Sequence, residues 1–311
     1  METFSPKLDK ISENIIYLLS LDSKTSVSNI ARVLCKPRKI IENRVKKIFD
    51  KGYVKPLLIF NHDNMVRATL FLKLSHVDAK VIEAIRKTSP LIKLKETLGM
   101  YDLSILVIAN EEEELQRIIS QINEKFHDSL QNLELVYHDL EDTLGFKSFC
   151  HNYNFIRKYK LLQPSKKVQL GKTEIALLDI LKHKPNSTYR ELISKTGFSY
   201  KNIKNLLDSL KEKKIIRFSL DPDYNLLGLE FHNLMVKVNL AKRDEFESSI
   251  LKEPRVHWMK RGIGRWDYIL SICTQNISEF IDVTRGIKSK NRAIIFDASA
   301  LVSKINITRK Y

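Results

Sequence analysis

Cationic and amide side chains gathered in two short segments are the residues of this sequence best suited to binding chemistry. Arginine and lysine contact phosphate, and arginine and asparagine also pair with base edges in a major groove. We expect the early residues of the first segment, 38–43, at base edges and the later ones, 44–47, at phosphates. Lysine-rich helix faces often contact only water, which is the alternative for both segments. Double-stranded DNA is therefore the predicted partner of Lys36, Arg38, Lys39, Glu42, Asn43, Arg44, Lys46 and Lys47, and of Tyr200, Lys201, Asn202, Lys204 and Asn205.

Familiar catalytic and metal-binding patterns are missing from the sequence. It contains no His-Glu-x-x-His, Gly-x-Ser-x-Gly or Gly-x-x-x-x-Gly-Lys run. Its cysteines, Cys35, Cys150 and Cys273, are too widely spaced for a zinc site built from thiol pairs. The acidic run 111–114 is typical of a helix N-terminus, where negative charge is favourable. We therefore expect no metal, no cofactor and no enzymatic activity.

The elements that must position the cationic segments occur twice. Apolar residues of the first half reappear 162 positions later, as Leu19 does at Leu181 and Ile41 does at Ile203. Further along, the spacing drifts to 165, where Gly99 corresponds to Gly264. A constant spacing that then drifts predicts a duplicated unit with small loop insertions, because the period is far longer than that of a solenoid repeat.

The front part of each copy is helical. Apolar residues recur with helical spacing in three short segments, and Pro37 opens the third. Tyr53, Val54 and residues 57–60 predict a β-hairpin wing. In the second copy, Ser199 is a suitable N-cap for the third helix. These features predict a winged helix-turn-helix at residues 1–60 and again at 168–220. A plain three-helix bundle is the alternative.

The back part of each copy alternates strands and helices in the order β-α-β-β-α-β, with a strand at 103–109, a helix at 112–126 and last strands at 133–138 and 292–296. This order predicts a ferredoxin-like domain at residues 61–150 and again at 221–311. Between the copies, residues 151–167 mix basic and aromatic side chains, and we interpret them as a basic linker rather than a nucleic-acid contact. The expected fold class is α+β: a tandem repeat of a winged helix-turn-helix followed by a ferredoxin-like βαββαβ domain.

The net charge of +16 favours a polyanionic partner. Counted by segment, the charge is +6 in 1–60, −5 in 61–150, +5 in 151–167, +6 in 168–220 and +4 in 221–311. Both predicted winged helices are basic, as contact with phosphate requires, and the first α/β part is acidic. No apolar run is long enough to span a membrane and no signal peptide is visible, so we expect a cytoplasmic protein with no membrane partner.

Several short motifs, taken together and in order, resemble the Lrp/AsnC family of feast/famine regulators. They are Leu8-Asp9-Lys10-Ile11, Gly52-Tyr53-Val54-Lys55 and Gly99-Met100-Tyr101-Asp102 in the first copy, and Leu226-Leu227-Gly228 and Gly264-Arg265-Trp266-Asp267-Tyr268 in the second. The resemblance covers nearly the whole chain twice, whereas the family has one unit per chain. The sequence also departs from the family at Cys35, where a turn glycine is common.

This resemblance implies a DNA reader joined to a ligand-sensing α/β domain that dimerises through its sheet. The Gly-x-x-Asp turns would lie near a pocket for a small-molecule effector, often an amino acid. The implied effector-binding residues are Gly99, Tyr101, Asp102, Gly264, Trp266 and Asp267. Ordinary turn chemistry explains a Gly-x-x-Asp run equally well, so a purely structural role stays open.

The sequence therefore predicts a sequence-specific, DNA-binding transcription regulator. Its two α/β parts would pair their sheets within one chain as a pseudo-dimer, or between chains as a homo-oligomer. An architectural protein that coats DNA is one alternative, because it would use the same cations.

A second alternative is an enzyme, because the sirohaem decarboxylases resemble this family in architecture. Under that reading, His257-Trp258 on a strand could donate a proton, and Arg261 and Arg265 could hold carboxylates. The His-Asn-Tyr run expected at that strand is absent there and occurs instead at His151.

Overall fold

A computed structural model describes residues 3–60, 66–77, 79–86, 91–109, 111–151 and 170–308. The chain divides into two compact units, and each draws on both sequence copies: Met1–Asp63 with Asp142–Glu230, and Asn64–Glu141 with Phe231–Tyr311. Apart from His151, the predicted basic linker 151–167 lies outside the described residues. Within the described part of the chain, no helix is both long and apolar enough to cross a membrane.

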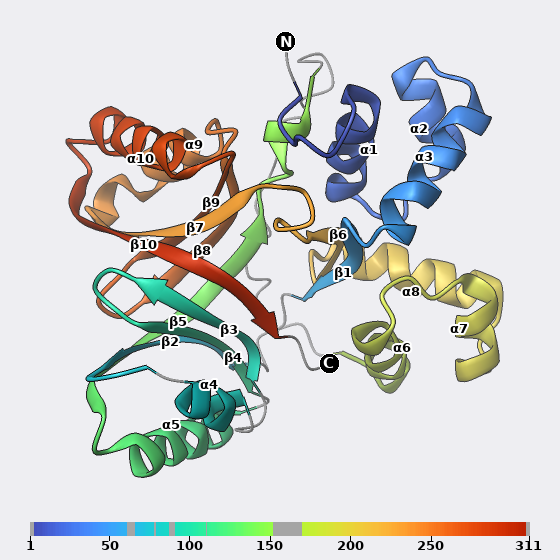
Figure 1. The fold of residues 1–311 in the computed structure, drawn as a ribbon. Helices are drawn as coiled ribbons and strands as arrows, with labels where there is room; N and C mark the ends of the chain where they lie inside the picture. The colour runs from blue at the N-terminus through green and yellow to red at the C-terminus, as the bar shows by residue number, and fades with distance from the viewer. Residues whose placement is uncertain are drawn as a thin grey trace. The chain divides into compact units, whose positions relative to one another are not determined.

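The first unit is mainly helical (Figure 1). Its elements from the first copy are α1 (Lys10–Leu21), α2 (Val27–Leu34), α3 (Arg38–Asp50) and β1 (Val54–Phe60), followed by the short helix η1 (Lys147–Phe149). From the second copy come α6 (Lys172–His183), α7 (Tyr189–Thr196), α8 (Tyr200–Glu212) and β6 (Ile216–Pro222). The mixed α/β character and the succession of three helices and a strand in each copy agree with the sequence prediction.

Local chemistry explains where these helices begin and end. The Ser199 side chain accepts a hydrogen bond from the Asn202 amide at 3.2 Å, so its predicted role as the N-cap of α8 is confirmed. The residue after α2 and the residue after α7 both adopt the left-handed conformation: Cys35 has φ +50° and Gly197 has φ +71°. Because glycine adopts this conformation without steric cost, Cys35 is the strained member of the pair.

β1 and β6 pair with each other, not with strands of their own copies. They run antiparallel in continuous register from Val54 opposite Pro222 to Phe60 opposite Ile216. The prediction of a separate hairpin wing after each third helix is therefore wrong for the described residues. Two short strands of equal length satisfy each other's backbone groups, which neither could do alone as an exposed edge.

The second unit is built from strands with helices on their outer side. The first copy supplies β2 (Val66–Leu74), α4 (Ala79–Arg86), β3 (Leu91–Leu98), β4 (Leu103–Ala109), α5 (Glu112–Phe126) and β5 (Leu130–Thr143). The second supplies β7 (Glu230–Val238), η3 (Leu240–Lys242), α9 (Arg243–Ile250), β8 (Val256–Ile263), β9 (Tyr268–Thr274), α10 (Ile277–Lys290) and β10 (Ile295–Thr308).

Among the described residues, these strands form one closed barrel in the order β10-β3-β4-β2-β5-β8-β9-β7 (Figure 1). Each copy contributes four neighbouring strands, and the two groups join where β5 meets β8 and where β10 meets β3. The predicted pairing of sheets within one chain is therefore what the structure shows. Closure removes the exposed strand edges that each group would have alone.

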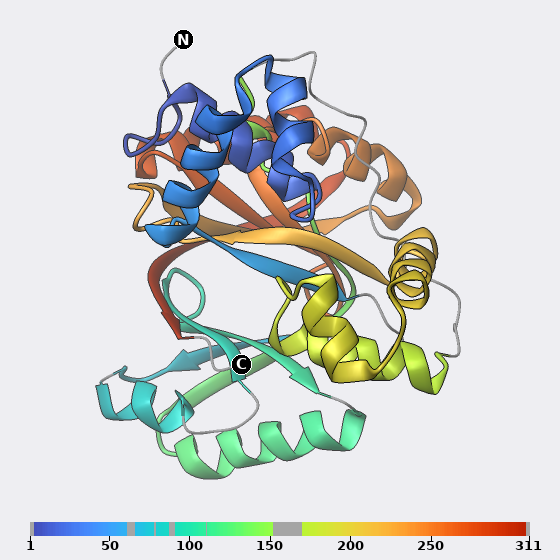
Figure 2. The same ribbon diagram turned by 90° about the vertical axis from the view of Figure 1, so that its right-hand side faces the viewer.

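The strands of the first group bury apolar residues on both faces. Leu70, Leu94 and Ile105 pack with Leu115 and Ile122 of α5 in one apolar core. In Figure 2, α4 and α5 lie along this outer face of the strands. Because side chains alternate across a strand, the residues between them point into the barrel. The barrel interior contains a second apolar cluster: Phe71, Tyr101, Val136, Met235, Trp266, Ile269 and Leu301.

Candidate anion-binding site inside the barrel

The residues predicted to contact DNA lie on the outer faces of α3 and α8 and just before α3. All are exposed except Arg44, which is half-buried and lies 3.3 Å from Asp9. Lys39 lies 3.6 Å from Glu42, and the Tyr200 ring packs against Tyr189 with their centroids 4.8 Å apart. The structure thus leaves most of these side chains in solvent and does not gather them into a buried site.

The two Gly-x-x-Asp turns have the same structure in both copies. Gly99 has φ +138° and Gly264 has φ +149°, and an added Cβ would lie 2.9 Å and 2.7 Å from backbone oxygens of Ala300 and Leu135. Glycine is required at both positions by the backbone conformation and by the close approach of the neighbouring strand.

The aspartates of these turns fasten strands together. Asp102 accepts from the Leu74 amide at 2.8 Å and lies 3.1 Å from the Lys73 ammonium group. Asp267 accepts from the Val238 amide at 2.8 Å. These contacts give both carboxylates a structural function, and effector binding at the turns stays a prediction.

The middle residues of the two turns meet inside the barrel. Trp266 Nε1 donates to the Tyr101 hydroxyl at 3.3 Å, and Tyr101 donates in turn to Glu134. Arg265 pairs with the same Glu134 at 2.7 Å. Burial and the hydrogen bond to Glu134 raise the pKa of Tyr101 to about 12, so it stays protonated. The structure therefore brings Tyr101 and Trp266 together in a buried contact between the two copies.

Beyond this apolar centre, the barrel interior is basic. Arg67 of β2, Lys95 of β3 and Lys260 of β8 are on the inward faces of their strands, with exposed fractions of 8% and 6% for the first two residues and 13% for the Lys260 side chain. Lys93 lies two residues before Lys95, on the same face. Glu141 is the carboxylate at this cluster, 3.5 Å from Lys260. Within the described part of the chain, Glu141 pairs with Lys260, and no ion pair joins Arg67 or Lys95 to a carboxylate.

Part of this cluster is unpaired. Within the described part of the chain, the Nε atom of Arg67 is buried without a hydrogen-bond partner. Lys95 has no ion pair with a described residue and lies over the Phe231 ring, 4.3 Å from its centroid. Burial, followed by the charges of Lys93 and Lys260, holds the pKa of Lys95 well below its ordinary value. A buried cation without a partner carries a desolvation cost that a bound anion would offset.

His138 of β5 lies beside these cations. Its Nε2 is 2.8 Å from the Thr69 hydroxyl, and its Nδ1 is buried with no hydrogen-bond partner among the described residues. Burial and the nearby Lys260 lower the pKa of His138 to about 3, so the ring is neutral over the physiological range. Although burial alone would raise the pKa of Glu141, the charge of Lys260 holds it below the ordinary value.

The inward strands are irregular where the cluster lies. The β3–β4 register shifts between Leu91 and Lys93, and the β8–β9 register shifts at the corresponding place, between Val256 and Trp258. Such bulges locally re-aim side chains and often occur next to binding sites. They set the inward direction of Lys93 and Trp258 at equivalent positions of the two copies.

The residues proposed from sequence for the enzyme alternative are occupied elsewhere. His257 is the fully buried extra residue in the β8 bulge. Arg261 pairs with Asp139 at 2.9 Å and with Glu247 of α9 at 3.3 Å, on the outer side of the barrel. Arg265 is paired with Glu134, as described above. None of these contacts places them in the basic cluster.

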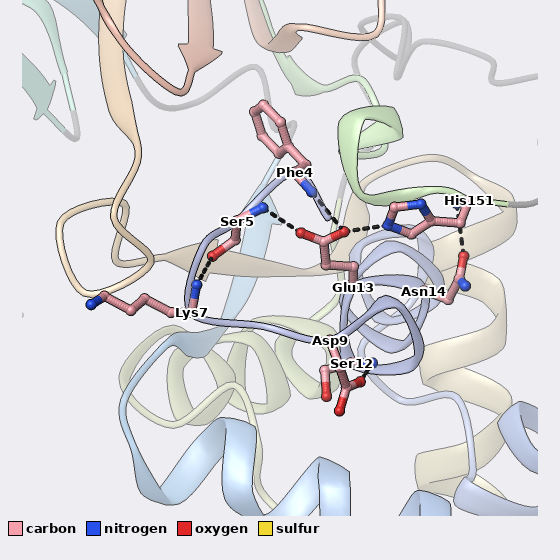
Figure 3. A network of polar contacts seen from close by, with 8 residues as sticks. All are labelled: Phe4, Ser5, Lys7, Asp9, Ser12, Glu13, Asn14 and His151. Atoms are coloured by element: carbon pink, nitrogen blue, oxygen red, sulfur yellow. Dashed lines mark hydrogen bonds and ion pairs between the residues drawn. The ribbon is translucent and has the colours of Figure 1, made fainter. Parts of the chain in front are cut away.

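The His-Asn-Tyr run begins in the first unit. His151 contacts the carboxylate of Glu13, which is fully buried in α1 and also accepts from the Phe4 amide at 3.0 Å and from the Ser5 amide (Figure 3). The His151 amide donates to Asn14 at 2.9 Å. Asn152 and Tyr153 lie outside the described residues. Glu13 therefore anchors the start of the chain and His151 to α1.

The sequence patterns did not point to Arg67, Lys93, Lys95 or His138. They belong to the segment 61–150, whose summed charge is −5 because acidic residues on the exposed start of α5 outweigh them. A signal was nevertheless present. Polar residues alternate with core residues as Arg67-x-Thr69 and Lys93-x-Lys95, and in a closed barrel the polar face is the inward one.

No protein-family model and no curated protein sequence matches the chain. Among solved structures, the siroheme decarboxylase NirDL is 12% identical, with a TM-score of 0.60 over 95% of this chain and 91% of that chain. Its co-complex with an iron-uroporphyrin III analogue is 13% identical, with a TM-score of 0.58 over 94% and 91%. The regulator LrpC of B. subtilis is 20% identical, with a TM-score of 0.37, and covers 46% of this chain and all of that one.

These comparisons correct two predictions. A DNA-binding regulator without enzymatic activity was expected, but the solved structure whose fold matches almost the whole chain is that of a siroheme decarboxylase. The error has a physical cause. Net charge does not distinguish cations exposed to solvent from cations buried to hold a small anion.

Proposed function

We propose that this protein is an enzyme that removes carboxyl groups from a carboxylate-rich tetrapyrrole of the sirohaem type, bound inside the barrel. The observation that carries the proposal is the excess of buried cations around Arg67 and Lys95, in an architecture shared along nearly the whole chain with a siroheme decarboxylase. In the same proposal, the two helical parts are winged helix-turn-helix modules and each four-strand group is a ferredoxin-like sheet.

The charge of the cluster selects the class of ligand. Surface cations remain hydrated and bind weakly to any anion, whereas buried cations without partners favour an anion that can displace water completely. Carboxylates suit this site, because guanidinium and ammonium groups form short charge-assisted hydrogen bonds with them.

Decarboxylation exchanges a carboxylate for a proton: R–COO⁻ plus H⁺ gives R–H plus CO₂. The site must therefore hold a carboxylate and deliver a proton to the carbon that loses CO₂. Arg67, with an unpartnered Nε, is suited to the first task. His138 is suited to the second, because a bound anion would raise the proton affinity of a ring whose pKa is otherwise depressed by burial and by Lys260.

Anaerobic incubation of the full chain with sirohaem tests this function. We expect mass spectrometry of the extracted pigment to show stepwise loss of CO₂. Arg67→Gln should lower kcat/KM by on the order of a hundredfold, since it removes a charged contact in a low-dielectric site. Arg285→Gln is the matched control, because the Arg285 side chain is 78% exposed on α10 and should not affect turnover. Unchanged sirohaem after incubation with the folded wild-type chain would refute the proposal.

A further inference from the structure

Lys95 and Lys260 occupy the same place in the two copies. They are 165 positions apart, the spacing that also relates Gly99 to Gly264. Lys95 of β3 lies opposite Ser104 of β4, and Lys260 of β8 lies opposite Ile269 of β9, at equivalent steps of the two ladders. Each side chain follows an equivalent bulge and points into the same interior. The duplication has thus placed two ammonium groups in one buried space.

The partners of the two lysines differ. Lys260 lies 3.5 Å from Glu141, whereas the described residues supply no ion pair to Lys95. Phe231, over whose ring Lys95 lies, has Arg67 as its counterpart in the first copy, 164 positions earlier. Among the described residues, Lys260 therefore has a carboxylate partner, whereas Lys95 has an aromatic face. A cation–π contact offsets less of the cost of burial than a carboxylate does.

We propose that Lys95 and Lys260 form the two ends of a single polycarboxylate-binding site that spans both copies and takes one ligand per chain, with Lys95 binding a carboxylate that the described residues do not supply. The inference deepens the proposed function and rests on it. Two separate anions would repel each other in this low-dielectric interior, whereas carboxylates carried by one molecule enter together.

The electrostatics of the free site support this assignment. Burial and the charge of Lys260 disfavour the protonated form of Lys95, so a carboxylate that binds to it should draw a proton with it. Binding and proton uptake are then linked at Lys95.

Calorimetric titration with uroporphyrin III, a metal-free polycarboxylate, tests the inference without turnover. We expect one molecule per chain, and proton uptake seen as a dependence of the heat on buffer ionisation enthalpy. Lys95→Met should weaken binding by on the order of a hundredfold and abolish most of the uptake. Lys304→Met is the control, because the Lys304 side chain is 72% exposed, and it should bind as the wild type does. Lys95→Gln serves as a second variant, with folding checked by thermal unfolding.

The outcomes separate this inference from the proposed function. Two molecules per chain, no uroporphyrin binding, or a folded Lys95 variant that binds like Lys304→Met would overturn the inference. If one molecule binds through Lys95 but sirohaem is not decarboxylated, the inference stands and the proposed function fails. If sirohaem is decarboxylated with an unchanged KM in Lys95→Met, the proposed function stands and the inference fails.

Discussion

The two copies share one backbone plan inside the barrel but have different inward side chains. Arg67 and His138 in the first copy correspond to Phe231 and Ser303 in the second, at spacings of 164 and 165. In the proposed function the first pair would hold and protonate a carboxylate, whereas the second pair has an aromatic ring and a hydroxyl group. Lys95 and Lys260 are retained in both copies. The comparison shows that a duplicated scaffold can keep its anchoring cations twice while its reactive groups remain on one side.

Of the substitutions that test this difference between the copies, removal of the Glu141 carboxylate should change the unfolding free energy most. Glu141→Gln leaves Lys260 and Arg67 buried without a counter-charge, and we expect a loss of about 2–3 kcal/mol in unfolding free energy, below the ~3–5 kcal/mol of a fully buried pair. Urea unfolding measures the loss. Glu96→Gln, which removes a carboxylate paired with the mostly exposed Lys304, is the control and should cost far less. Equal losses of unfolding free energy in Glu141→Gln and Glu96→Gln would contradict a buried charge cluster around Glu141.

His138 should make the unfolding free energy depend on pH in the acidic range. Its counterpart Ser303 has no group that titrates there. Its folded pKa of about 3 lies below the ordinary 6.5, so the unfolded state binds the proton first and stability falls as pH drops below 6.5. Between pH 7 and pH 5 this amounts to about 2 kcal/mol. His138→Gln should flatten that part of the stability profile, whereas Ser303→Ala should leave it unchanged. If His138→Gln lost stability between pH 7 and pH 5 as the wild type does, His138 would not be a neutral, buried residue.

Lys95→Met should stabilise the ligand-free protein, in contrast to Lys260→Met. The depressed pKa of Lys95 means that the unfolded chain binds more protons between that pKa and 10.5, so wild-type stability rises with pH there. Below the depressed pKa the substitution should add on the order of 1 kcal/mol, and the gain should shrink as the pH rises and Lys95 loses its charge. Thermal unfolding across pH measures the difference. A gain that grows with pH would contradict this sign.

Cys35→Gly tests the same comparison in the helical unit, with the smallest expected effect. Its counterpart Gly197 adopts the same left-handed backbone without a side chain. We expect a gain of about 0.5–1 kcal/mol from relieved strain, reduced by the greater freedom of glycine in the unfolded chain. Gly197→Ala should cost a similar amount, measured by chemical unfolding.

Sequence periodicity predicted the positions of the helices and strands better than it predicted which strands pair with each other. The helix 112–126 and the strand 103–109 were expected at the bounds that α5 and β4 have. The strands expected at 133–138 and 292–296 instead run from Leu130 to Thr143 and from Ile295 to Thr308. These are the strands that cross to the other copy. Alternation shows which face of a strand is apolar but not which strand lies beside it, so neither the crossing nor the closed barrel followed from the pattern.

The candidate site was less predictable than the fold. Lys93 and Lys95 lie in a segment whose total charge is acidic, and only closure of the barrel turns their face inward. His257 was singled out for its residue type, and a bulge in β8 makes it the fully buried extra residue of that strand. Residue types narrowed the chemistry to cations and histidine, and the topology decided which of them meet.

The pairings of β5 with β8 and of β10 with β3, which join the two copies, also affect how such a protein can evolve. Two unlike subunits made from separate genes must find each other and must avoid pairing with their own kind. Here the unlike halves are synthesised together, in equal number and on one chain, so no selection against self-association is needed. Mutations that specialise one half can therefore accumulate without endangering assembly of the other.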